Sequence, residues 1–434
     1  MDGEERRIQP CKQAPWYWQY KGKPVLLLGG SDEDNLFQWT GERLTSHLDR
    51  LVECGGNYLR NTMSDRDEGD VYPFDRKGES YWLHLFNREY MDRLEFFLRE
   101  TQKREIIVQL TLWDQHDFSG TQWDSHPWNP RHNQIGLEAS GVDGPRAFFA
   151  SVKERNALLL PYQEKFVDKI LSVSLEFDHV LYNITNEGWA GIEWERHWAR
   201  RIRRQAALRG TRVEVTDMQH GPEGSVEAMI GAPEDFSYAE ISQNNNWSLG
   251  GAGQEHWDNI QLWRSRIEQT TGPRPINNVK VYGSDETGKR SFGDADAAVR
   301  RFFRIIWGGC ASARFHRPNS GLGLGPTARN CIRSLRLFTD ELHPFDCAPR
   351  NDLLSDRAPD SAYCLARPGK RYGIYFTDGG RATLDLSDAA GRFKVKWLGT
   401  DGEGWSHEST AAAGERCILS APGEGPWMAL LSKA

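Results

Sequence analysis

The stretch Val180–Glu187 (VLYNITNE) ends an apolar run with an amide beside a carboxyl group, and Gly188 and Trp189 follow it. Such an ending indicates a buried strand whose last residues belong to a site, because an interior position rarely keeps unpaired polar groups. Later in the chain a second strand-like run, Val279–Tyr282, reaches Asp285 and Glu286. Two carboxyl groups at the ends of two strands are what hydrolysis of a glycosidic bond requires, provided that the strands converge.

Regular alternation of strand-like and helical segments predicts that convergence. The predicted strands are 25–28, 57–63, 106–112, 180–185, 213–216, 236–241, 279–282 and 313–316. The predicted helices are 44–52, 90–100, 158–175, 195–208, 257–267, 295–307 and 327–342. Eight strands followed by helix-sized segments predict a (β/α)8 TIM barrel over residues 1–348. A doubly wound sheet would need a Gly-rich phosphate loop after strand one, and the acidic Ser31–Asp34 is not one.

The pattern changes after Pro349. Short strand-like runs without helical periodicity alternate with turns rich in Gly, Pro and Asp. This spacing predicts a small antiparallel β-sandwich over residues 349–434.

Composition limits the partners. The 434 residues carry a net charge of -7 and no basic block, which argues against nucleic acid. Seventeen Trp favour a carbohydrate surface, since indole faces stack on sugar rings. The seven Cys show no metal or paired spacing, and neither a signal peptide nor a membrane span is visible. We therefore expect a cytoplasmic protein without cofactor or metal; the sequence does not address its oligomeric state.

Polar side chains gather at the carboxyl ends of the predicted strands, where barrel active sites lie. The candidate catalytic residues are Glu187 and Glu286. The candidate substrate-binding residues are Asp32, Arg60, Asn61, Trp113, Asp114, His116, Asn186, Asp217, His220, Asn245, Trp247, His316 and Arg317.

Several of these candidates have a second interpretation. Trp113 and Trp247 either stack on a sugar or plug the barrel top, and Asp285 competes with Glu286. His316 and Arg317 either bind an anionic sugar such as a uronate or pair with a loop acid.

These motifs resemble those of clan A glycoside hydrolases, in which an Asn-Glu pair ends strand four and a Glu ends strand seven. More narrowly, Gly22–Gly29 and the segment 363–387 are similar to bacterial apiosidase-like barrels that carry a C-terminal domain once labelled collagen-binding. The resemblance implies that Glu187 is the acid/base, that Glu286 is the nucleophile, and that Arg60 keeps the nucleophile ionised. The strand-six Tyr of the clan has no clear match, because Asn244–Asn246 stands at that strand end.

The leading hypothesis is a retaining, exo-acting glycosidase of a plant or microbial oligosaccharide or glycoside. The acid/base role requires a raised pKa at Glu187, which a nearby ionised Glu286 would provide. A catalytically silent carbohydrate-binding protein on the same scaffold is the alternative. A metal-dependent hydrolase is a third hypothesis, and it would need ligands that the sequence does not supply.

Overall fold

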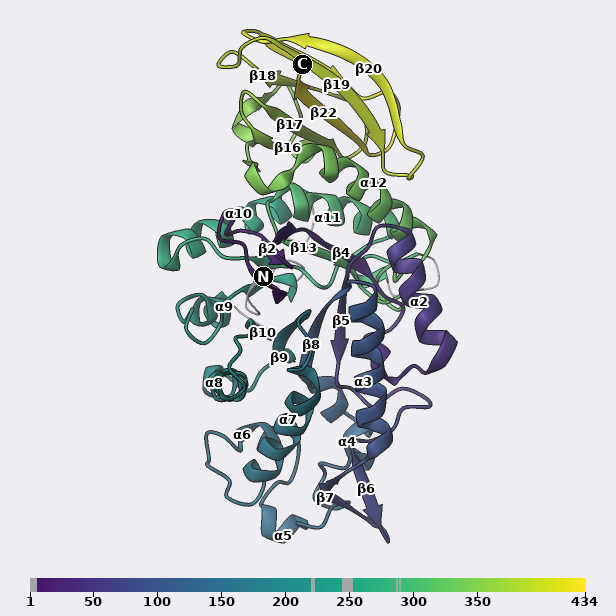
Figure 1. Ribbon diagram of the computed structural model, residues 1–434, viewed down its shortest axis with the longest axis vertical. Coiled ribbons are helices and arrows are strands. Elements are labelled where there is room, and N and C mark those ends of the chain that lie inside the picture. The colour runs from purple at the N-terminus through teal and green to yellow at the C-terminus, as the bar shows by residue number, and fades with distance from the viewer. Residues whose placement is uncertain (1–5, 220–222, 244–252, 286–287, 289) are drawn as a thin grey trace.

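A computed structural model describes residues 6–219, 223–243, 253–285, 288 and 290–434 of the protein. Figure 1 shows a barrel of strands with helices around it, and a β-rich domain that sits at one end, against α11 and α12. No helix in the described part of the chain is both long and apolar enough to cross a bilayer.

Eight parallel strands form the barrel. They are β4 (Leu27–Gly30), β5 (Tyr58–Thr62), β8 (Ile107–Asp114), β9 (Val180–Gly188), β10 (Val215–Gln219), β11 (Ala239–Glu240), β12 (Ile276–Asn277) and β13 (Ser312–Phe315). Six of them pair in the order β10-β9-β8-β5-β4-β13, and β11 pairs with β12. The strands are nearly continuous runs of buried residues, as expected for a parallel sheet covered on both faces.

Backbone hydrogen bonds join the β11-β12 pair to both edges of the six-stranded sheet and close the barrel. On one side Ser237 donates to the Val215 carbonyl at 2.9 Å. On the other side Ala311 donates to the Ile276 carbonyl at 2.7 Å, and Val281 bridges Phe315. The carboxyl ends of all eight strands therefore meet at one face.

Eight helices form the outer layer. They are α2 (Gly41–Glu53), α3 (Arg88–Lys103), α7 (Leu160–Ser174), α8 (Ile192–Leu208), α9 (Glu223–Ile230), α10 (Gly253–Thr271), α11 (Ala295–Trp307) and α12 (Pro326–Leu342). Side chains cap two of them: Asn87 accepts from the Glu89 amide at the start of α3, and Asp294 accepts from the Ala297 amide at 2.9 Å at the start of α11.

The first residues of the chain cover the amino end of the barrel. A small antiparallel sheet, β1 (Gln9–Pro10), β2 (Trp18–Tyr20) and β3 (Lys23–Val25), precedes β4. Trp18 is fully buried, and its indole Nε1 donates to Asn277 Oδ1 on β12 at 2.8 Å. The segment thereby plugs the end of the barrel opposite the strand carboxyl ends.

Two antiparallel sheets make the C-terminal β-sandwich. The larger has the order β14-β16-β17-β22-β19-β20 and the smaller β15-β18-β21. Their strands are β14 (Ala348–Pro349), β15 (Leu354–Ser355), β16 (Ala362–Arg367), β17 (Arg371–Phe376), β18 (Arg381–Asp385), β19 (Arg392–Gly399), β20 (Trp405–Ala412), β21 (Arg416–Ser420) and β22 (Trp427–Lys433).

The sandwich docks on the barrel through aromatic residues of α11. Trp307 Nε1 donates to the Gly373 carbonyl at 2.8 Å, and the Phe303 and Tyr375 rings stack at 5.1 Å. A Cβ at position 373 would lie 2.9 Å from a Leu342 methyl group, so only glycine allows this close approach. Barrel and sandwich therefore share one apolar core at their junction.

The predicted architecture is confirmed, two of the predicted strands differ, and one segment outside the predicted elements is partly helical. The first strand is two elements, β3 and β4, separated at Leu26. The seventh strand is β12, so 279–282 keeps only the bridge at Val281. The polar segment after strand three folds into short helices, α4 (Thr121–Ser125), α5 (Leu137–Ser140) and α6 (Pro145–Ala150).

Candidate active site

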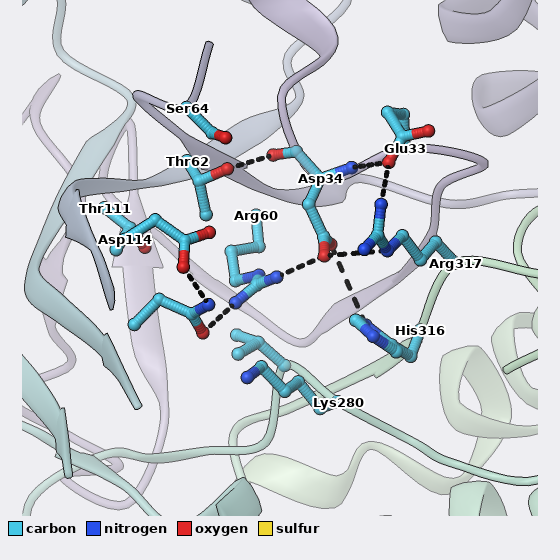
Figure 2. Close-up of polar contacts among 12 residues, drawn as sticks. Glu33, Asp34, Arg60, Thr62, Ser64, Thr111, Asp114, Lys280, His316 and Arg317 are labelled. Carbon is cyan, nitrogen blue, oxygen red and sulfur yellow. Dashed lines mark hydrogen bonds and ion pairs between the residues drawn. The ribbon is translucent and has the colours of Figure 1, made fainter. Parts of the chain in front are cut away.

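Asn186 is held in one orientation at the end of β9. Its Oδ1 accepts from Arg60 Nη1 at 2.7 Å, and its Nδ2 donates to Asp114 Oδ1 at 2.8 Å. All three side chains are buried, and they come from β5, β8 and β9. Figure 2 labels Arg60 and Asp114. Because both the oxygen and the nitrogen of the side-chain amide have partners, these two hydrogen bonds fix the orientation of Asn186.

Glu187 follows in a backbone conformation that a residue with a side chain rarely adopts, with φ at 56°. Strain of this kind persists where the surroundings fix it, and it occurs often at functional sites. The turn directs the carboxylate to residues from three other strand ends. Because a strained Glu is unfavourable for folding, a role for its side chain is the simplest reason to keep it.

At least four donors surround the Glu187 carboxylate. Oε1 accepts from Gln243 Nε2 at 2.7 Å and from the Tyr282 hydroxyl at 3.4 Å. Lys280 Nζ also donates to Oε1 in an ion pair, and its side chain is buried. His116 Nε2 lies 3.1 Å from Oε2.

These neighbours keep Glu187 ionised. Burial alone would raise the pKa of Glu187, but the Lys280 ammonium and His116 lower it well below its usual range. The hydrogen bond to Glu187 in turn raises the pKa of His116. The raised pKa that the sequence led us to expect for Glu187 is therefore wrong, because the Lys280 ammonium lies beside its carboxylate.

A cleft adjoins the carboxylate. A cavity of about 760 Å³ is lined by His116, by the segment 143–146 before and within α6, and by Trp189. A second hollow of about 560 Å³ shares Arg146 and Trp189 with it. Through His116, the Glu187 cluster lies at the edge of a space in the size range of ligand pockets.

A second charged cluster lies beneath the first, around Asp34. Arg60 Nη2 lies 2.7 Å and Arg314 Nη2 3.1 Å from the Asp34 carboxylate. Arg317 Nε lies 3.5 Å from it, and Figure 2 shows Arg60 and Arg317 on either side of Asp34. Burial would raise the pKa of Asp34, but these arginines hold it well below its usual range. Burial lowers the pKa of His316, whose Nδ1 lies 3.7 Å from the Asp34 carboxylate.

Two of the predicted substrate-binding residues, Arg317 and His316, belong to this cluster. Arg317 also donates to Glu33 at 2.5 Å, and His316 is buried beside Asp34. Of the two interpretations of this pair, the salt bridge to a loop acid is the one that the geometry fits.

Trp113 does not face the cleft. It is buried in an aromatic cluster between β8 and the helices, with the Trp194 and Trp198 rings at 5.7 and 5.4 Å. Because β8 continues to Asp114, alternate residues point to opposite sides, and Trp113 points to the helix layer while Asp114 points inward. Stacking of Trp113 on a sugar is therefore wrong.

Three further predicted substrate-binding residues contact other groups of the protein around the site. Asn61 is buried and accepts from the Phe37 amide at 2.9 Å. Asp32 accepts from the Leu324 amide at 2.7 Å and lies 3.4 Å from His47. Asp217 is buried and accepts from the Thr185 amide at 3.3 Å. Glu286, His220, Asn245 and Trp247 lie outside the described residues.

The sequence interpretation missed Lys280, Gln243 and Tyr282. Lys280 had a signal: a single cation between Val279 and Val281 in an apolar run needs a buried partner. Gln243 and Tyr282 carry no such signal, because a polar residue after a strand is common in loops. Within the described residues no group of three or more His, Cys, Asp and Glu is arranged to hold a metal ion.

Solved structures with the same architecture bear names of glycoside hydrolases. A glycoside hydrolase family 5 protein from Bacteroides vulgatus matches with a TM-score of 0.68 at 10% identity, over 98% of this chain and 94% of that one. A family 5 mannosidase from Rhizomucor miehei, solved with mannosyl-fructose, matches with a TM-score of 0.54 at 14% identity, over 77% and 97%. A maltogenic α-amylase from Thermotoga neapolitana matches with a TM-score of 0.57 at 10% identity, over 94% and 99%.

At these identities the likeness establishes the fold, and it agrees with the predicted barrel and sandwich. No protein-family model and no curated protein sequence matches the chain.

Proposed function

We propose that this protein is a glycoside hydrolase in which Glu187 is one of two catalytic carboxylates and Glu286 is the other. The observation that carries the proposal is the Glu187 carboxylate itself, strained in its backbone, ionised, and placed at the edge of a cleft. The shared fold of solved glycoside hydrolases supports it.

The charge of Glu187 favours an exchange of the two expected roles. An anion held by Lys280, Gln243 and Tyr282 suits attack on the anomeric carbon, whereas a proton donor would need the neutral form. Glu187 Oε then forms the bond to the anomeric carbon as the leaving oxygen departs with a proton from Glu286. Water next breaks the glycosyl ester, and its proton returns to Glu286, so configuration is retained.

The substrate that we propose is a carbohydrate, cleaved from a chain end. Residues 115–116, 118–120 and 143–146, from the segment after strand three, line the cleft. Loops on a rigid scaffold commonly carry binding function, and we propose that this one limits the cleft to the terminal sugar of a chain.

The test is an activity screen of wild-type protein against aryl glycosides and oligosaccharides, with Glu187→Gln beside it. Glu187→Gln should lose at least about a thousandfold in kcat, because a carboxylate of this mechanism has no substitute. Glu193→Gln on the exposed face of α8 is the matched control and should keep full activity. Full activity of Glu187→Gln would sink the proposal.

Azide distinguishes the two roles. In Glu187→Ala, azide should enter from the face that the missing carboxylate left and give a glycosyl azide of inverted configuration. An azide product of retained configuration would mean that Glu187 is the acid/base and Glu286 the nucleophile.

A carbohydrate-binding protein without turnover is the second candidate, and the Lys280 ion pair is the observation in its favour. A carboxylate that is neutralised by a buried ammonium can hold sugar hydroxyls without reacting. Sugar binding by calorimetry, combined with no turnover across the whole screen, would establish this function instead.

A further inference from the structure

Two hollows beside Glu187 meet at Trp189 and Arg146. The first is lined by His116, the residue that contacts the Glu187 carboxylate. The second continues beyond Trp189 and is lined by Phe149 and Lys153 as well. Together they form a path of ligand-pocket size that begins at His116, the neighbour of the candidate catalytic carboxylate, and leads away from it.

Trp189 presents an indole face to this path. It is 45% exposed, and no other Trp within the described residues is among the exposed large apolar side chains. The ring is held from behind by Phe149, edge to face at 5.1 Å, and Phe149 packs in turn on Trp194 at 5.0 Å. A large aromatic side chain that is fixed in place and left open to solvent is typical of a binding surface.

The far hollow is cationic. Its charged lining residues are Arg146 and Lys153, and no acidic residue is among the described residues that line it. Neither cation forms an ion pair with a carboxylate of the described chain, although the protein has a net charge of -7. Two cations without acidic partners, beside an open indole, fit a ligand that has both a flat ring and a negative charge.

We propose that Trp189, Arg146 and Lys153 form a subsite for an acidic sugar, a uronate-bearing unit next to the sugar that Glu187 cleaves. This proposal rests on the proposed function for the identity of the cleaved bond, but the subsite binds without any reaction. Trp189 stacks on the pyranose face, and Arg146 and Lys153 bind the carboxylate of the sugar. Arg317 and His316, which the sequence suggested for this role, are occupied by Glu33 and Asp34.

The experiment measures binding in a background that does not turn over. Glu187→Gln is titrated by calorimetry with a panel of uronate-bearing oligosaccharides and their uncharged counterparts, alone and combined with Trp189→Ala, Trp189→Phe or Arg146→Gln. Trp189→Ala should weaken binding of the acidic oligosaccharides about tenfold, which corresponds to about 1.4 kcal/mol. Trp189→Phe should restore most of it, because the ring face remains. Arg131→Gln, on the exposed surface of the same segment, is the charge-matched control and should change nothing.

The Arg146→Gln variant tests the contribution of the positive charge separately from that of the Trp189 ring. It should weaken the acidic oligosaccharides about tenfold and leave the uncharged ones unchanged. If no acidic oligosaccharide of the panel binds more weakly to the Trp189→Ala or Arg146→Gln protein, the subsite is overturned. The proposed function fails separately, when Glu187→Gln keeps the turnover of the wild type in the activity screen.

Discussion

Asp34, which is buried, and Glu187, which is partly buried, both have lowered pKa values, yet they have different kinds of partners. Asp34 is surrounded by arginines, Arg60 and Arg314 among them, and is closed off from the cleft. Glu187 is paired with Lys280 and His116, and His116 lines the cleft. An arginine keeps its charge at any pH that a protein meets, whereas lysine and histidine can release a proton.

The difference separates a structural ion pair from a candidate catalytic one. Arginines, which stay charged, keep the Asp34 carboxylate ionised, and this suits a structural ion pair that links neighbouring strands. A titratable set allows the charge around the carboxylate to change when substrate arrives. The two sites are therefore distinguished by whether the partners are arginines or titratable residues, and not by the lowered pKa that both carboxylates share.

The largest expected effect is on stability. Asp34→Asn leaves buried arginines without their carboxylate and should destabilise the protein by about 3–5 kcal/mol in urea unfolding. Glu187→Gln should cost less, about 1–2 kcal/mol, because Lys280 can become neutral. Asp388→Asn, at an exposed turn of the sandwich, is the control. Equal losses of unfolding free energy in Asp34→Asn and Glu187→Gln would contradict this distinction between the two sites.

The next effect concerns the pH dependence of activity. Lys280→Met removes the cation that stabilises the Glu187 anion, so the acid limb of kcat/KM should move to higher pH by about 1–3 units. Lys280→Arg keeps the charge and should leave that limb in place. The same pKa shift makes the Glu187 anion stabilising above its unfolded pKa near 4.3, a contribution that is lost as pH falls through the folded pKa. An unmoved acid limb in Lys280→Met would show that Glu187 does not control it.

The smallest effect is on His116. Glu187→Gln removes a hydrogen bond to an anion, so the pKa of His116 should fall by about one unit in an NMR titration of its ring proton. Because the pKa is raised in the wild type, the pair contributes stability below about pH 6.5 and loses it as pH rises through the folded pKa. The stability gap between wild type and Glu187→Gln should thus narrow at alkaline pH. Glu193→Gln should leave the His116 titration unchanged, and an unchanged titration in Glu187→Gln would contradict the contact.

The fold was predictable because its signals are local. Apolar runs that end in polar residues mark the barrel strands, and the change of period after Pro349 marks the sandwich. Asn186 and Glu187 were predictable for the same reason, since they end the strongest of these runs.

The rest of the candidate site depends on details that periodicity does not carry. Two extra residues at the end of β8 turn Trp113 outward, and β12 ends at Asn277, so Lys280 lies beyond the strand and contacts Glu187. Gln243 and Tyr282 reach Glu187 only because the barrel closes. Such contacts come from strand register and closure, which one sequence does not specify.

The plug at the amino end of the barrel has a consequence for the order of events during synthesis. Trp18 can form its hydrogen bond to Asn277 only after that residue, which is 259 positions later in the chain, has been synthesised. At roughly 5–20 residues per second, the ribosome needs about 13–50 s to make that partner. The earliest tryptophan-rich segment therefore leaves the ribosome with its apolar surface uncovered, and the barrel closes only after nearly the whole domain has emerged.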